Sequence, residues 1–63
     1  MKLSLYISVI RSDESIHVIS GERTMFFGKV GNAYTELPDD YLNNAEVIDV
    51  FSSFCGMCIE AVL

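Results

Sequence analysis

Basic residues are scarce in this sequence. Its 63 residues include four lysines and arginines against nine acids, which gives a formal net charge of -5 at pH 7. Proteins that bind nucleic acid contact phosphates through clustered lysine and arginine side chains, and four scattered bases do not supply such a cluster. The composition therefore argues against direct binding of nucleic acid.

Recognisable catalytic motifs are lacking too. Tryptophan is absent, histidine occurs once, and no nucleophile elbow or glycine-rich phosphate loop is present. A chain this short holds one small core, so residues 1–63 are predicted to form a single domain with little room for a substrate pocket. With 51% hydrophobic and 21% charged residues the chain is not of the disordered class. We expect a folded protein that is not an enzyme.

Long hydrophobic runs are also missing. None approaches the ~18 apolar residues that cross a bilayer, so no membrane contact is expected. Residues 1–10 superficially resemble a signal peptide, but serines interrupt the apolar stretch and no small-x-small cleavage site follows. We expect a cytosolic protein whose two cysteines are reduced thiols or metal ligands.

Alternating apolar and polar residues predict most of the secondary structure. Period-two alternation predicts a first strand over residues 3–9, and β-branched and aromatic runs predict strands at 16–20 and 25–30, with polar turns between them. Two further strands are predicted at 46–51 and 57–63. Residues 31–34 are expected to break the strand pattern.

One short helix is predicted between the third and fourth strands. Pro38 suits a helix start, acids follow it in the first turn, and Leu37, Tyr41 and Leu42 can share an inward face. The order β-β-β-α-β-β predicts an α+β fold, with the helix over one face of a mainly antiparallel sheet of about five strands.

Charge is distributed unevenly along the chain. Residues 31–63 contain six acids and no base, and five of the acids surround the predicted helix: Glu36, Asp39, Asp40, Glu46 and Asp49. They can form a solvated surface that keeps the protein in solution. They can equally form an acidic patch that docks on a basic groove of a nucleic-acid-binding protein, with Phe54 or Tyr41 as an aromatic anchor.

The two cysteines form a C-x-x-C pair, Cys55 and Cys58. Thioredoxin-like chemistry needs the first cysteine at a helix N-terminus, but the five residues after Cys58 resemble a strand. Two thiolates at this spacing supply half of a tetrahedral zinc site, which His17 and a carboxylate, or a second chain in a homodimer, could complete. The alternatives are two buried thiols in the core and a partly exposed histidine on a strand.

From Ile16 onwards the sequence resembles a group of small phage and prophage proteins of Gram-positive bacteria. The similar stretches are VISGE at 18–22, MFFGKV at 25–30, LPDDYL at 37–42, EVIDV at 46–50 and CIEAV at 58–62. The sequence departs from that group in the turn from Cys55 to Cys58, where polar residues are expected. The group offers no catalytic residues to carry over.

Small size and acidity also resemble anti-CRISPR proteins as a class. The two resemblances imply a phage-encoded inhibitor in the host cell cytosol. Its partner would be a CRISPR effector nuclease, or another nucleic-acid-binding protein, whose nucleic-acid-binding surface it would block. The second hypothesis is a zinc-stapled structural domain or homodimer without an inhibitor role.

Overall fold

Three short helices and a sheet make up the part of the chain that the structure describes. The computed structural model describes residues 1–54 and 56–63, the side chain of Ser53 excepted. The elements in chain order are α1 (Leu3–Ser8), β1 (Ser15–Ser20), β2 (Arg23–Lys29), α2 (Val30–Glu36), α3 (Asp39–Asn44), β3 (Glu46–Ser53) and β4 (Gly56–Val62). The predicted α+β class is confirmed.

The sheet is mixed. Its strand order is β2-β1-β4-β3, with β1 and β4 parallel at the centre and an antiparallel neighbour outside each of them. The strands predicted at 16–20, 25–30, 46–51 and 57–63 are present, with slightly different bounds, as β1, β2, β3 and β4. Five strands and one helix were expected, whereas the described residues form four strands and three helices.

The first predicted strand is wrong, because residues 3–8 form α1. Leu3 and Ile7 are both fully buried, whereas Leu5 and Val9 are exposed. Residues four apart lie on one face of a helix. A sequence with an apolar residue at every second position also has apolar residues four apart, so it fits a helix as well as a strand. Burial therefore follows the helical spacing inside a sequence that also alternates.

Residues 31–34 break the strand pattern as expected, and they do so as part of a helix that was not predicted, α2. Val30, Ala33 and Leu37 are buried at spacings of three and four residues, which is the helical repeat. The predicted helix is present in shorter form as α3, with Pro38 just before it and Asp39 and Asp40 in its first turn. Both helices are too short to be stable without packing on the sheet.

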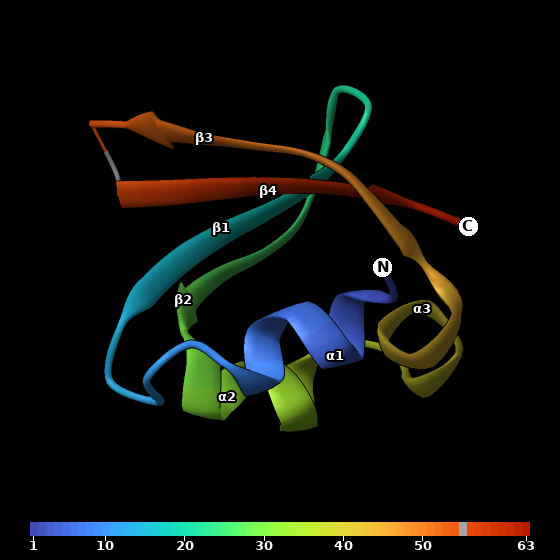
Figure 1. Ribbon diagram of the computed structural model, residues 1–63, viewed down its shortest axis with the longest axis horizontal. Helices are drawn as coiled ribbons and strands as arrows, with labels where there is room; N and C mark the ends of the chain where they lie inside the picture. The colour runs from blue at the N-terminus through green and yellow to red at the C-terminus, as the bar shows by residue number, and fades with distance from the viewer. Residues whose placement is uncertain (55) are drawn as a thin grey trace.

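All three helices lie on the same side of the sheet, as Figure 1 shows. Their buried side chains meet those of alternate strand residues, such as Ile16, Val18 and Ile59. The opposite side of the sheet has no element over it in the described part of the chain. This open face is therefore the surface on which the remaining strand residues are presented.

The N-terminus is tied to β3. Lys2 pairs with Glu46 in an antiparallel bridge outside the named strands. On either side of that bridge, the Leu3 N–H donates to the Ala45 carbonyl and the Val47 N–H donates to the Met1 carbonyl, both at 2.8 Å. Met1 and Lys2 thus lie along the first residues of the β3 edge.

Candidate functional site

One row of side chains crosses the open face from edge to edge. The strand register places His17 of β1 opposite Phe27 of β2 on one side and beside Cys58 of β4 on the other. Cys58 in turn lies opposite Phe51 of β3. We call these four residues the aromatic row. Paired residues share a face of the sheet, so the row lies opposite the core.

The interior of the aromatic row is closely packed, while its two ends are exposed. The rings of His17 and Phe27 are 5.4 Å apart, and His17 Nδ1 lies 3.9 Å from Cys58 Sγ. The other ring nitrogen, Nε2, is 3.0 Å from Thr24 Oγ1. Cys58 is only 5% exposed, whereas Phe27 is 59% and Phe51 43% exposed. Large aromatic surfaces therefore face solvent on either side of a held histidine.

Two carboxylates lie next to the aromatic row. The register places Asp49 of β3 directly opposite Glu60 of β4, and Glu60 is also the neighbour of Ile19 on β1. Like charges directly opposite on adjacent strands destabilise a sheet. In the described part of the chain, neither carboxylate takes part in an ion pair. We call Asp49 and Glu60 the acidic pair.

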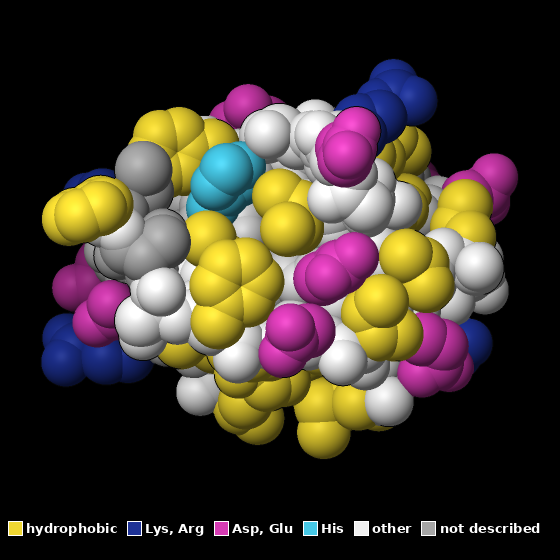
Figure 2. Space-filling model, turned by 90° about the horizontal axis from the view of Figure 1, so that it is seen from above, with side chains coloured by type: hydrophobic (Ala, Val, Ile, Leu, Met, Phe, Trp, Pro, Cys, Tyr) yellow, Lys and Arg dark blue, Asp and Glu magenta, His cyan; other side chains and the backbone are white. Residues whose placement is uncertain are grey.

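Figure 2 looks onto the open face. The histidine lies among hydrophobic side chains, acidic side chains lie close by, and the lysine and arginine side chains in view are at the periphery. This agrees with the sequence, since β1, β3 and β4 contain neither lysine nor arginine. The open face thus combines apolar area with uncompensated negative charge.

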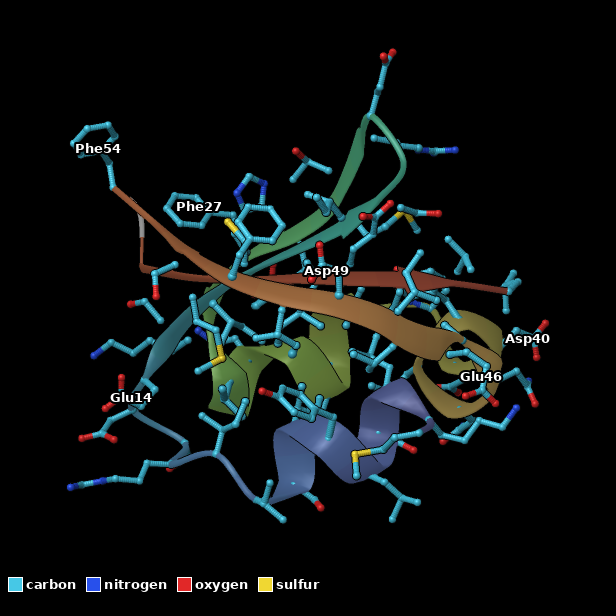
Figure 3. All side chains as sticks on the ribbon, turned by 45° about the horizontal axis from the view of Figure 1, so that its top comes forward. Glu14, Phe27, Asp40, Glu46, Asp49 and Phe54 are labelled. Carbon is cyan, nitrogen blue, oxygen red and sulfur yellow. The ribbon has the colours of Figure 1, made fainter. Side chains whose placement is uncertain are left out.

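The five predicted acids do not form one surface. Figure 3 shows Asp40 and Glu46 together at the α3 end of the molecule, while Asp49 stands on the sheet. Glu46 is already neutralised: its carboxylate lies 3.0 Å from the Met1 ammonium and 3.0 Å from Lys2 Nζ. These hydrogen bonds, the Met1 ammonium first and Lys2 second, lower the pKa of Glu46. Glu46, paired with Val62, also faces away from the core but is neutralised there, so in the described residues Asp49 is the one of the five that stands on the open face without an ion pair.

The remaining acids of the predicted patch belong to the helix layer. Glu36 ends α2, and Asp39 and Asp40 begin α3; all three are exposed. Acids in a first helical turn are favourable for local reasons, since they oppose the positive end of the helix dipole. Asp39 and Asp40 therefore have a structural explanation that the acidic pair lacks.

Of the two predicted aromatic anchors, one is buried. Tyr41 is 4% exposed, and its hydroxyl donates to the Ala61 carbonyl beneath the sheet. Burial, and then the negative charge of Glu60, raises its pKa. Tyr41 is thus a core residue and cannot serve as a surface anchor. Phe54, in the turn after β3, is fully exposed, as predicted for an anchor.

Two of the three predicted metal ligands lie side by side. His17 and Cys58 are neighbours in the aromatic row, and the third predicted ligand, Cys55, lies outside the described residues. Residues 1–54 and 56–63 contain no group of three or more histidine, cysteine or acidic side chains placed to hold a metal ion. The predicted zinc site stays a prediction that rests on two adjacent side chains.

Phe27, Phe51 and Glu60 were not predicted as site residues. The adjacent phenylalanines Phe26 and Phe27 must face opposite sides of a strand, and Phe26 is indeed buried while Phe27 is exposed. Glu60, an acid inside the otherwise apolar strand predicted at 57–63, was a second signal of a residue that faces away from the core. Only the pairing of β3 with β4 brings Glu60 opposite Asp49, and the sequence gives no register for that pairing.

Comparisons with known proteins gave no match: neither a family model, nor a curated protein, nor a solved structure is significantly similar to the chain. No described helix is long and apolar enough to span a membrane. The class of this protein is therefore described by its fold and its site alone. The described residues form a small α+β protein whose helices cover one face of a mixed sheet and whose other face exposes aromatic and acidic side chains.

Proposed function

We propose that this protein is a non-enzymatic binding protein that docks through the open face of its sheet onto a basic, nucleic-acid-binding surface of another protein. The partner we propose first is a host defence nuclease of the CRISPR effector type, which the resemblance to small phage proteins implies. The single observation that supports this docking mode is that the aromatic row lies beside the acidic pair, whose two carboxylates take part in no ion pair in the described residues.

Exposed aromatic side chains supply the apolar part of such an interface. Phe27 and Phe51 lie at opposite ends of the aromatic row and are exposed at 59% and 43%. Aromatic residues at the centre of an interface provide much of the binding free energy once water is excluded around them. His17 is held between them by Phe27, Thr24 and Cys58, so that little ordering is needed on binding.

The acidic pair supplies the charge selection. Asp49 and Glu60 face each other across neighbouring strands and repel, so a lysine or arginine of the partner placed between them relieves that repulsion. Arginine also stacks on aromatic rings, which the neighbouring Phe51 offers. A second copy of this chain would instead bring two acidic faces together. The charge of the open face therefore favours a basic partner over a homodimer.

The proposal is tested by measuring the affinity of the full chain for purified CRISPR effector nucleases, with and without bound nucleic acid. We expect binding to weaken with salt and to be competed by nucleic acid. The double variant Asp49→Asn/Glu60→Gln is expected to bind about tenfold or more weakly, because it removes both charges of the acidic pair.

A matched control is available on the helix layer. Asp39→Asn/Asp40→Asn removes the same charge from α3, outside the proposed interface, and is expected to leave the affinity within about twofold. Equal losses in the two double variants would show that net charge, not the open face, drives binding. Loss in the α3 variant alone would place the interface on the helix layer and contradict the proposal.

The second candidate function is a zinc-stapled structural domain, and one distance favours it. His17 Nδ1 and Cys58 Sγ are 3.9 Å apart. Tetrahedral zinc with its usual bond lengths to nitrogen and sulfur separates two such ligands by about 3.6 Å. A small adjustment of either side chain would let both bind one ion, and zinc would then stabilise the sheet across β1 and β4.

Native mass spectrometry before and after treatment with a chelator tests this second function. A zinc-bound mass that disappears on chelation, together with a lowered melting temperature, would support it. His17→Gln should then abolish the metal-bound mass, whereas Phe27→Leu, a neighbouring change without a ligand atom, should not. A mass equal to that of the metal-free chain and a melting curve unchanged by chelator would remove zinc from the account.

A further inference from the structure

The two edges of the sheet differ in how they are protected. Both edge strands have a register shift, β2 opposite Val18 and Ile19 and β3 at Ile48, but only the β2 edge carries basic residues, Arg23 and Lys29. Charged side chains and irregular pairing keep an edge from accepting another strand. The β3 edge has eight residues without lysine, arginine or proline, and it exposes Ile48, Val50 and Phe51. It is the less protected edge.

The first part of the β3 edge already binds an extended segment. Met1 and Lys2 pair antiparallel with Glu46 and Val47 through the bridge and the backbone hydrogen bonds described above. Across this short pairing, Lys2 Nζ lies 3.0 Å from Glu46 Oε1. The N-terminus thus shows the kind of strand that this edge accepts: extended, antiparallel, and with a basic side chain opposite an acid.

Beyond Val47 the edge has no strand beside it in the described residues. The outward N–H of Val50 donates to the carboxylate of the preceding residue, Asp49, at 2.9 Å. A backbone donor is therefore held by a side chain that an incoming carbonyl could displace. Displacement would free the Asp49 carboxylate to pair with a basic side chain of the incoming strand.

We propose that an extended segment of the partner adds to β3 as a further strand, antiparallel to it, along residues 48–53. The segment carries a lysine or arginine next to Asp49 and apolar side chains beside Val50 and Phe51. This is strand addition at a sheet edge, in which backbone hydrogen bonds give affinity and alternate side chains give specificity. It rests on the proposed docking function and names the binding mode of the segment nearest β3.

A second copy of the chain fits this edge less well. Two β3 strands would contribute two aspartates and no base to the shared pairing, whereas the pairing seen at Lys2 and Glu46 is between opposite charges. A basic segment repeats that pairing at the next acid along the edge. The occupant is therefore assigned to the partner and not to a homodimer.

The probe is a capped peptide, acetyl-Lys-Thr-Val-Val-Lys-Thr-Lys-Thr-amide, titrated into the full chain while its amide signals are followed by NMR. We compare two isomers of this peptide. One carries backbone N-methyl groups at its odd-numbered positions and the other at its even-numbered positions. Both keep the same charge and side chains, but only one keeps the amides that pair with β3. We expect one isomer to bind about as the parent peptide does and the other about tenfold or more weakly.

The position of binding is checked by hydrogen exchange. The Val50 amide should become more protected when the parent peptide binds, and amides of β2 should not change. Asp49→Asn keeps an acceptor for the Val50 amide but removes the negative charge, so it should weaken binding of the peptide. Glu36→Gln, which removes a charge from α2, should leave binding of the peptide unchanged. Equal affinities of the two isomers would overturn the proposal, as would self-association of the chain through β3 without peptide.

Failure of this inference is distinguishable from failure of the proposed function. Phe27 lies on β2, at the opposite edge of the sheet. Phe27→Ser should therefore weaken binding of the nuclease without changing affinity for the peptide. If open-face variants weaken nuclease binding while the isomers bind alike, the docking function stands and strand addition is wrong. If peptide binding follows expectation but open-face variants leave the nuclease unaffected, the proposed function is wrong.

Discussion

On one face of the sheet, Ile16, Val18 and Ile59 are fully buried beneath three helices, whereas on the other face Phe27 and Phe51 stay exposed. The buried residues of the covered face are apolar, and the helices of the same chain pack against them. The open face combines aromatic area with two opposed carboxylates, an arrangement that does not stabilise the free protein. The comparison indicates that the covered face maintains the fold, and the open face is the one through which we propose that the protein binds a partner.

The largest effect is expected from truncation on the covered face. Ile59→Ala removes a fully buried side chain and should lower the free energy of unfolding by about 2–5 kcal/mol, enough to unfold many chains of this size. Phe51→Ala on the open face should cost about 1 kcal/mol or less. Denaturant unfolding of the two variants measures both. Similar losses would mean that the open face also supports the fold.

A smaller loss is expected for the hydroxyl of Tyr41. Tyr41→Phe removes the hydrogen bond to the Ala61 carbonyl and should cost about 1 kcal/mol. The pKa of Tyr41 is raised above its ordinary value of 10.0, so the neutral form is favoured in the folded state. The stabilisation is therefore complete below pH 10 and is lost as the pH rises through the folded pKa. Unfolding curves of the variant and the parent should converge at strongly alkaline pH.

The acidic pair should respond in the opposite direction. Asp49→Asn removes one of two like charges that face each other, while the amide oxygen can still accept from the Val50 N–H. The free protein should gain about 0.2–1 kcal/mol, and the gain should shrink as salt is added. Thermal unfolding at low and high ionic strength measures this. A loss of stability would show that Asp49 serves the fold.

The smallest effect concerns Glu46, whose side chain is 49% exposed. Its pKa is lowered from 4.5 by the Met1 ammonium and by Lys2, so the charged form is favoured in the folded state. The contribution is present above pH 4.5 and is lost as the pH falls through the folded pKa. Acetylation of the N-terminus, which removes the stronger partner, should raise the pKa of Glu46. An NMR titration that finds no change would remove the ion pair from the account.

Much of the fold could be predicted from the sequence, and the errors have physical causes. The strands β1 and β2 follow from two β-branched and aromatic runs on either side of Gly21, whose positive φ of 64° suits the turn between them. The strand predicted over residues 3–9 is wrong, because Leu3 and Ile7 lie four residues apart and fit a helix as well as a strand. Packing of Leu3 and Ile7 under the sheet selects the helix, and packing is not visible in a single sequence.

The site was predicted less well than the fold. Charge counting found Asp49 but grouped it with Asp39 and Asp40, which belong to a helix start on the other layer. Sequence neighbours need not share a surface once a strand follows a helix. Glu60 lies eleven residues from Asp49 in the sequence and opposite it in the sheet, and only the strand register shows this.

The most direct test of the central claim is a comparison of two double variants in one binding assay with a purified CRISPR effector nuclease. Asp49→Asn/Glu60→Gln and Asp39→Asn/Asp40→Asn remove equal charge from the open face and from α3. The account predicts that the first binds about tenfold or more weakly and that the second binds within about twofold of the parent chain. Equal affinities, or a loss confined to the α3 variant, would contradict it.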